Sequence, residues 1–290
     1  MRTRSYLIST CGKNSKVSIT MEEMLRQARK NVTNFVFDVD GTLTDETSRV
    51  LPQNIEALQK IHEAGYPITL ATGRTLHGAR NILDRIGVPG WVVACTGAVV
   101  WDGEKIVTVH ALPVEEYRLA IEFAKKYGMA IFASSAEGYY EQSFGTYIDP
   151  DIILNANEGV APVGVDLESL DPNTISKLSF AGDLETVNNT ESEWSALFEG
   201  AVRGHELFID VVAPDVTKWR GIADMLEARG LHADGVVGAG DTDNDISWLK
   251  NVGAGFAMPH AQPGVIDASR GVLPDVEAPV AWLVSQILDS

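Results

Sequence analysis

The fold is decided by the stretch Phe35-Val36-Phe37-Asp38-Val39-Asp40-Gly41-Thr42-Leu43-Thr44. Its apolar start predicts a buried strand, and two carboxylates and a glycine follow at once. Because an unpaired carboxylate in a dry core is costly, acids at a strand tip indicate a site open to solvent, substrate or metal. In parallel α/β sheets, ligands bind outside the carboxyl ends of the strands.

Two later apolar runs end in the same way. Ile68–Ala71 is followed by Thr72 and Gly73, and Gly235–Gly240 is followed by the acid-rich stretch Asp241–Asp245. A helix-like pattern follows each run, and strands that alternate with helices indicate a parallel sheet. If the three strands are neighbours, their tips converge on one crevice, which would hold Asp38, Asp40, Thr72, Asp241 and Asp245.

Hydrophobic periodicity predicts the other elements of an α/β protein. Helices are expected over residues 22–30, 52–64, 75–86, 114–127, 190–198, 216–227, 246–250 and 279–288. Strands are expected over residues 91–94, 98–101, 106–110, 175–180, 207–212 and 255–258.

The character of the sequence changes between about Pro113 and His205. Short strand candidates alternate there with turns rich in Gly, Asp, Pro and Asn, and no strand tip carries the acid-rich pattern. This change indicates an inserted α/β domain, and the strand over 207–212 is expected to return to the main domain. The expected divisions are an N-terminal extension over 1–30 (loosely ordered over 1–20), a main domain over 31–112 and 206–290, and the insert over 113–205.

Composition limits the classes of partner. The chain has 290 residues, 45% of them hydrophobic, and a formal net charge of −17. A large hydrophobic core is therefore available. An acidic surface repels nucleic acid and anionic lipid, so we expect neither as a partner. A phosphorylated substrate would also be repelled at long range, so local cations would have to offset that field.

Cysteine usage and hydropathy favour the cytoplasm. Cys11 and Cys95 form neither a metal-binding spacing nor a disulfide framework. Cys95 is expected to be buried in a strand rather than reactive. The longest apolar stretch, Trp91–Trp101, is about half of the ~20 residues that a membrane span requires. Residues 1–20 do not resemble a signal peptide.

The residues at the predicted strand tips suit phosphoryl transfer. An aspartate such as Asp38 can attack phosphorus and form an acyl-phosphate. Asp40, two residues on, would point to the same side and could protonate the leaving oxygen and then deprotonate water. Gly41 permits a sharp turn and exposes N–H groups to an oxyanion. Clustered carboxylates repel one another, and Mg²⁺, which prefers such ligands, would resolve that conflict.

Four motifs, in this order, resemble the haloacid dehalogenase (HAD) superfamily. They are Asp-Val-Asp-Gly-Thr from Asp38, Thr-Gly-Arg from Thr72, the lysine of Thr-Lys-Trp-Arg-Gly-Ile at Lys218, and Gly-Asp-Thr-Asp-Asn-Asp ending at Asp245. The motifs cover roughly residues 33–110 and 206–290. The insert and the stretch Gly255–Ala261 are similar to the Cof-type sugar-phosphatase branch of that superfamily.

The resemblance implies a role for each matching residue. Asp38 would be the nucleophile and Asp40 the acid/base. Mg²⁺ would be held by Asp38, the backbone carbonyl of Asp40 and Asp241, with Asp245 supporting it directly or through water. The phosphoryl group would be bound by Gly41, Thr72, Gly73, Lys218 and Asn244, the last of which would also help to fix its loop. The resemblance further implies a Rossmann-like core and a cap domain that closes over the site and selects the substrate.

Two positions depart from the family pattern. Thr96-Gly97-Ala98 stands where the family often has Asn-Gly-Ala, and His260 stands where it often has Asn. Neither position is catalytic in the family, so the departures concern substrate contacts. Dehalogenation is disfavoured, because family dehalogenases lack an acid at the position of Asp40.

Structural interpretations exist for the same residues. Asp38 and Asp40 also suit an Asp-Gly turn, Asp241–Asp245 also suits the acidic start of a helix, and Thr72 also suits a helix cap. Lys218 alone would suit a surface position. The order of the motifs favours the functional interpretation, except for Asp243, which we assign to helix capping.

The sequence therefore predicts a Mg²⁺-dependent phosphatase that hydrolyses a small phosphorylated metabolite, such as a sugar phosphate, through an aspartyl-phosphate. One alternative is a phosphomutase that uses the same nucleophile. Another is a non-catalytic sensor of a phosphorylated metabolite, although binding alone needs no nucleophile. The oligomeric state is not predicted.

Overall fold

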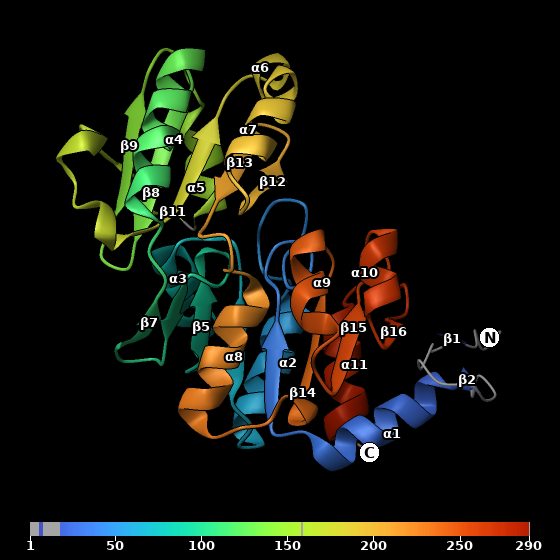
Figure 1. The fold of residues 1–290 in the computed structure, drawn as a ribbon. Coiled ribbons are helices and arrows are strands. Elements are labelled where there is room, and N and C mark those ends of the chain that lie inside the picture. The colour runs from blue at the N-terminus through green and yellow to red at the C-terminus, as the bar shows by residue number, and fades with distance from the viewer. Residues whose placement is uncertain (1–5, 8–17, 158, 290) are drawn as a thin grey trace. The chain divides into compact units, whose positions relative to one another are not determined.

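A computed structural model describes residues 6–7, 18–157 and 159–289 (Figure 1). The chain forms two compact units. The first takes its described residues from Met1–Leu70, Ile86–Trp91 and Leu226–Ser290, and the second consists of Ala71–Arg85 and Val92–Met225. The loose order expected over residues 1–20 falls mainly outside the described residues, as does Cys11.

The first unit contains a parallel sheet with the strand order β16-β15-β14-β3-β4. The strands are β3 (Asn34–Phe37), β4 (Ile68–Ala71, whose last residue begins the second unit), β14 (Val236–Gly240), β15 (Ala254–Ala257) and β16 (Gly271–Val272). β14 and β4 are thus the two neighbours of β3. This is the adjacency that the convergence of their tips requires.

Burial explains the composition of these strands. Every residue of β3, β4, β14 and β15 is buried. Parallel strands that are covered on both faces favour continuous apolar runs over alternation. The helices of this unit are α1 (Met21–Asn31), α2 (Pro52–Glu63), α9 (Asp243–Leu249), α10 (Pro263–Ala268) and α11 (Pro279–Leu288). α11 packs against both α1 and α2, and β1 (Tyr6–Leu7) pairs antiparallel with β2 (Ser18–Ile19).

The second unit contains a sheet with the order β10-β9-β8-β11-β13-β12, antiparallel except between β9 and β10. Its strands are β8 (Ala130–Ser135), β9 (Tyr139–Ser143), β10 (Val163–Gly164), β11 (Ile175–Ala181), β12 (Ala201–His205) and β13 (Phe208–Val211). β5 (Trp91–Ala94), β6 (Val99–Trp101) and β7 (Ile106–Val109) form an antiparallel meander.

Helices and short 3₁₀ turns complete the chain. The helices of the second unit are α3 (Leu76–Ile86), α4 (Val114–Tyr127), α5 (Pro150–Ala156), α6 (Leu184–Asn189), α7 (Glu191–Leu197) and α8 (Lys218–Arg229, which runs on into the first unit). The 3₁₀ turns are η1 (Cys95–Gly97), η2 (Leu167–Ser169), η3 (Pro172–Thr174) and, in the first unit, η4 (Ala233–Gly235). Within the described ranges, every helix is too short or too polar to cross a membrane.

The sheet around β8 buries both of its faces. Successive side chains of a strand point to opposite faces. Accordingly, Ile131 joins a core with Phe123 of α4 and Phe180 of β11. Its neighbour Phe132 joins a second cluster that includes Ile153 of α5. Both layers therefore depend on the alternation within one strand.

The predicted elements are largely confirmed. β4, α4 and α11 begin and end at the predicted residues. Two expectations are wrong. The strand over 207–212 is β13, which pairs with β11 and β12 rather than with the first-unit sheet, and Cys95 lies in turn η1, not in a strand. The division into 31–112 with 206–290 and 113–205 otherwise stays a prediction.

Substitution of Gly238 tests how closely β14 approaches β3. A Cβ atom at Gly238 would lie 1.9 Å from the backbone oxygen of Val36, which strand pairing holds in place. We expect Gly238→Ala to lower the free energy of unfolding by about 3 kcal/mol, as overpacking does, measured by urea denaturation. Gly164→Ala is the control, because its Cβ would meet nothing within 4 Å. Equal urea midpoints for the two variants would contradict the close approach.

Candidate active site

Two aspartates follow adjacent parallel strands. β3 ends at Phe37 and β14 at Gly240, so Asp38 and Asp241 are the next residues of each chain segment. The backbone N–H of Asp38 donates to the Ala239 oxygen at 3.1 Å, which continues the pairing of β3 and β14. The parallel sheet thus brings these two sequence-predicted residues to the same edge.

A third aspartate completes a cluster of carboxylates. Asp38, Asp241 and Asp245 each offer one oxygen within 4.8 Å of the others. Asp38 and Asp245 are buried, and the Asp241 side chain is 12% exposed. Three such acids repel one another at this separation. Their oxygens are the ligands that Mg²⁺ and Ca²⁺ prefer, so the donor set fits a hard divalent cation.

The loop after β3 is shaped around Asp241. Gly41 has a φ of +76°, and a Cβ atom there would lie 2.3 Å from Asp241 Oδ2. Thr42 donates its hydroxyl to Asp241 Oδ1 at 3.3 Å. The Gly41 N–H donates to Thr44 Oγ1 at 3.3 Å, so this N–H already has a protein partner. Glycine is therefore required here by both conformation and space.

Asp245 is held by donors from its own segment. Its Oδ2 accepts from the N–H groups of Asp241 and Thr242, each at 3.1 Å, and from the Thr242 hydroxyl at 3.3 Å. Its Oδ1 accepts from Nε1 of the buried Trp248 at 2.8 Å. Asp245 and the N-cap residue Thr242 form a capping box at the start of α9. The bond from the Asp241 N–H also fixes the loop that carries Asp241.

Other predicted residues lie around this loop. The Asp40 side chain is exposed, and Asn244 on α9 is partly exposed. Asp243 is exposed and lies in the first turn of α9, whose capping box is formed by Thr242 and Asp245. His260, one of the positions that departs from the family pattern, has its Nε2 at 3.6 Å from Asp241 Oδ2 and is 57% exposed.

Thr72 and Gly73 belong to the second unit. Thr72 is fully buried, and its N–H donates to the Val93 oxygen at 2.9 Å. Its Oγ1 accepts from the Arg74 N–H at 3.1 Å. Thr75, rather than Thr72, caps α3, because Thr75 Oγ1 accepts from the Gly78 N–H at 3.1 Å. The capping interpretation of Thr72 is therefore wrong.

Lys218 lies beside the same turn as Thr72. It is the first residue of α8 and is 2% exposed. A Cβ at Gly97 in turn η1 would lie 2.0 Å from the Thr217 oxygen, and the Thr96 N–H in that turn donates to the Thr72 oxygen at 3.0 Å. The second unit thus gathers Thr72 and Lys218 around η1, and their approach to the carboxylate cluster stays a prediction.

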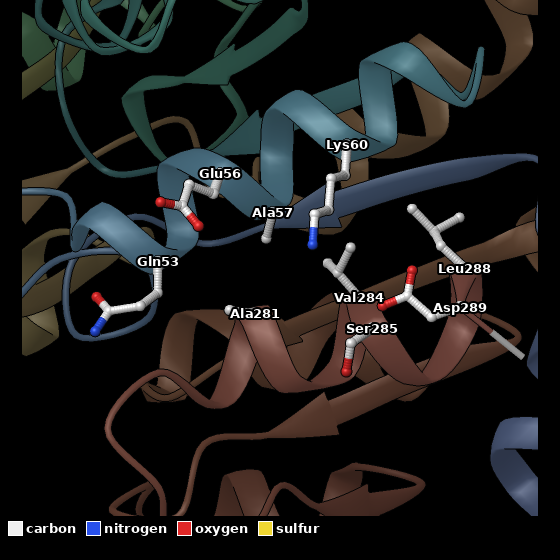
Figure 2. Close-up of a pocket in the computed structure, with 9 residues that line it drawn as sticks. All are labelled: Gln53, Glu56, Ala57, Lys60, Ala281, Val284, Ser285, Leu288 and Asp289. Carbon is white, nitrogen blue, oxygen red and sulfur yellow. The ribbon is translucent and has the colours of Figure 1, made fainter.

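Figure 2 shows a groove between α2 and α11. Its lining includes Gln53, Glu56 and Lys60 of α2 together with Ser285 of α11. Neither the clustered aspartates nor the Thr72 segment contributes to this lining. We therefore place no chemistry in this groove.

Sequence reasoning missed three residues that support the predicted ones. Thr42 binds Asp241, Trp248 binds Asp245, and Lys177 of β11 donates from Nζ to the Gly73 oxygen at 2.8 Å. Thr42 stands within the first motif, so its position was a usable signal. Trp248 and Lys177 offered none, because their roles depend on where α9 and β11 pack.

Comparison with known proteins identifies similar phosphatases and one matching family. The sequence profile of haloacid dehalogenase-like hydrolases matches residues 35–281. The chain is 23% identical over 228 residues to the 5-amino-6-(5-phospho-D-ribitylamino)uracil phosphatase YcsE of Bacillus subtilis, which covers 78% of this chain and 83% of that protein. It is 24% identical over 258 residues to the pyridoxal phosphate phosphatase YbhA of Escherichia coli, covering 82% and 92%.

A solved structure with 25% sequence identity is similar over most of its length. It is described as a HAD subclass IIB sugar phosphatase, and it matches with a TM-score of 0.73 over 88% of this chain and 96% of its own. The predicted fold class, an α/β protein with a Rossmann-like parallel-sheet core, and the predicted enzyme class, a HAD-type phosphatase, are confirmed. The chain belongs to the haloacid dehalogenase-like hydrolases, in their Cof-type branch.

Proposed function

We propose that this protein is a Mg²⁺-dependent phosphatase that hydrolyses a small phosphorylated metabolite, with a sugar phosphate as the favoured class. The observation that carries the proposal is the cluster of Asp38, Asp241 and Asp245 at the ends of β3 and β14. Asp40, two residues after Asp38, is exposed and so accessible to a substrate. A binding protein would need the cluster but not this second acid.

The donor set supports Mg²⁺ as the cofactor. Asp38, Asp241 and the backbone carbonyl of Asp40 would hold the ion, and all of them are oxygen ligands of the kind that Mg²⁺ prefers. When bound, the ion would neutralise charge on the clustered carboxylates and on the phosphoryl group.

Asp38 and Asp40 would divide the chemistry. A carboxylate oxygen of Asp38 attacks phosphorus while the bond from phosphorus to the ester oxygen breaks, and Asp40 gives its proton to that leaving oxygen. Water then attacks the phosphorus of the aspartyl phosphate, and Asp40 accepts a proton from it. The bond between phosphorus and Asp38 breaks, which releases inorganic phosphate and restores both carboxyl groups.

Thr72, Gly73, Lys218 and Asn244 are proposed to bind the phosphoryl group, as is Gly41, whose N–H would exchange its Thr44 acceptor for a phosphoryl oxygen. For Thr72, chain geometry supports this role. Leu70 of β4 pairs with Phe37 of β3, and Thr72 comes directly after β4 as Asp38 comes directly after β3. For Lys218, the support is its place in the family motif and its position beside the turn that contacts Thr72.

The proposed substrate class rests on similar proteins. YcsE and YbhA are named for small phosphorylated metabolites, and the subclass IIB structure is described as a sugar phosphatase. The net charge of −17 disfavours nucleic acid as a partner. A cytoplasmic location stays a prediction.

Asp245 is proposed to position the site rather than to bind the metal directly. Its two oxygens accept hydrogen bonds from the Asp241 and Thr242 N–H groups, the Thr242 hydroxyl and Trp248 Nε1. A carboxylate oxygen shared among several N–H and O–H groups is a weak additional ligand. Asp245 would then hold the Asp241 loop in place and so support the metal indirectly, through Asp241.

Substitution of the two acids tests the chemistry. We expect Asp38→Asn to lower kcat for phosphate release by at least about 10³-fold, because the nucleophile is lost. We expect Asp40→Asn to lower it by about 10²–10⁴-fold, as loss of a general acid does. Release is measured over a panel of metabolite phosphates. Asp267→Asn, an exposed aspartate on α10, is the control, and full activity of Asp38→Asn would refute the nucleophile assignment.

Metal removal tests the cofactor. We expect chelation followed by desalting to abolish phosphate release, and added Mg²⁺ to restore it, because the cation offsets the repulsion among the carboxylates. Asp241→Asn should need a higher Mg²⁺ concentration for half-maximal activity than the wild type. Unchanged turnover in metal-free buffer would contradict the proposed cofactor. Formation of an isomer in place of free phosphate would indicate a mutase.

The positioning role of Asp245 predicts a loss of stability. In Asp245→Asn, an amide N–H₂ would face donors, so we expect the free energy of unfolding to fall by about 2–4 kcal/mol, measured by urea denaturation without metal. Asp267→Asn should change it by less than about 0.5 kcal/mol. An unaltered midpoint for Asp245→Asn would mean that these hydrogen bonds do not hold the loop.

A further inference from the structure

A buried lysine of β11 reaches the segment that follows β4. Lys177 is 8% exposed, and its Nζ donates to the Gly73 oxygen at 2.8 Å. The same Nζ lies 2.7 Å from Asp210 Oδ2 on β13, whose side chain is 14% exposed. The Ser179 hydroxyl donates to Asp210 Oδ1 at 2.6 Å. A buried ammonium needs such partners, since an unpaired one is too costly to desolvate.

The Gly73 carbonyl links Lys177 to Thr72. The Gly73 oxygen and the Arg74 N–H belong to one planar peptide group, and this N–H donates to Thr72 Oγ1 at 3.1 Å. Hydrogen bonds in such a series polarise and strengthen one another. A positive charge at the Gly73 oxygen therefore makes the Arg74 N–H a better donor to the Thr72 hydroxyl.

The bond from Arg74 also orients the Thr72 proton. A threonine hydroxyl has one proton to donate and two lone pairs with which to accept. Because Thr72 Oγ1 accepts from Arg74 through a lone pair, its proton is directed away from the peptide. That orientation is the one a phosphoryl oxygen, which only accepts, would need.

The backbone on both sides of this peptide is fixed. The Thr72 N–H donates to the Val93 oxygen, the Thr96 N–H to the Thr72 oxygen, and the Cys95 N–H to the Arg74 oxygen, at 2.9, 3.0 and 2.9 Å. Cys95 and Thr96 have φ values of +51° and +58°, in the left-handed region that residues other than glycine rarely adopt. Strained backbone persists where surrounding contacts enforce it, so turn η1 and Lys177 hold the Thr72 segment from two directions.

We propose that Lys177 is a positioning residue for phosphoryl binding: through the Gly73–Arg74 peptide it sets the orientation and donor strength of the Thr72 hydroxyl. The proposal rests on the phosphoryl-binding role of Thr72 given above. Lys177 would not touch the substrate. A strand far along the chain from the Thr72 motif would thereby determine how tightly that motif binds phosphate.

Two substitutions break the same ion pair between Lys177 and Asp210. Comparing them distinguishes an effect on the Thr72 hydroxyl from a general loss of stability. Lys177→Met removes both the Asp210 contact and the Gly73 hydrogen bond, whereas Asp210→Asn removes the ion pair but leaves Lys177 able to donate to Gly73. Lys126→Met is the control, because Lys126 forms an exposed pair with Glu193 on the same unit. All variants are checked for folding by circular dichroism and urea denaturation.

The primary readout is binding of inorganic phosphate in the presence of Mg²⁺, measured by calorimetry. We expect Lys177→Met to weaken it about 10-fold, within the limit of about 100-fold set by complete loss of the hydrogen bond from Thr72 to the charged phosphoryl group. Asp210→Asn and Lys126→Met should change it by less than about threefold. A folded Lys177→Met protein that binds phosphate as tightly as the wild type would overturn the proposal.

A double-mutant cycle with Thr72→Val tests the route of the effect. If Lys177 acts through the Thr72 hydroxyl, Lys177→Met should have little further effect on phosphate binding in the Thr72→Val background. Independent, multiplicative losses would overturn the proposal. If Lys177→Met does not fold, the double variant Lys177→Met/Asp210→Asn removes both buried charges and is compared with Asp210→Asn by the same criteria.

The outcome is distinguishable from a failure of the proposed function. Turnover of p-nitrophenyl phosphate is measured in parallel, and its absence in the wild type would count against the phosphatase assignment alone. The binding comparison would still decide the role of Lys177. Loss of turnover in Lys177→Met with unchanged phosphate binding would count against the positioning role.

Discussion

Mutual repulsion among three aspartates is the constraint on which the site depends. Asp38, Asp241 and Asp245 bring oxygens within 4.8 Å of one another in a largely buried setting, where screening by water is weak. The chain offsets part of this repulsion with its own donors, through Thr42 to Asp241 and through Trp248 to Asp245. What remains favours a divalent cation, so the stability of these loops and the affinity for the ion are linked.

The parallel sheet allows the folded chain to hold these acids close together. Asp38 and Asp241 come directly after β3 and β14, so their backbones are held by strand pairing while their side chains leave the core. Gly41 turns the chain away with a positive φ and leaves room for Asp241. Asp38 and Asp241 are thus each placed directly after a paired strand, and sites built on strands are more precise than sites built on loops.

Local signals in the sequence predicted the elements, and non-local pairing limited the rest. β4, α4 and α11 were predicted to the residue because apolar periods, prolines and glycines mark their ends. The strand over 207–212 was assigned to the wrong sheet, because alternation shows that a segment is a strand but not which strand it pairs with. Asp38, Asp241 and Asp245 lie together because β3 and β14 pair, and the acid-rich strand ends were the local signal for this arrangement.

Lys177 illustrates what such signals omit. A lysine in an apolar strand pattern usually marks the solvent face. Here the lysine is buried, and its ammonium group contacts Asp210 of β13 and the Gly73 carbonyl. With a net charge of −17, the protein repels phosphate esters at long range, but that field is screened beyond about 8 Å in physiological salt. Capture must therefore depend on short-range groups. A buried ammonium escapes most of this screening, so its influence on a neighbouring peptide survives at salt concentrations that silence the surface charges.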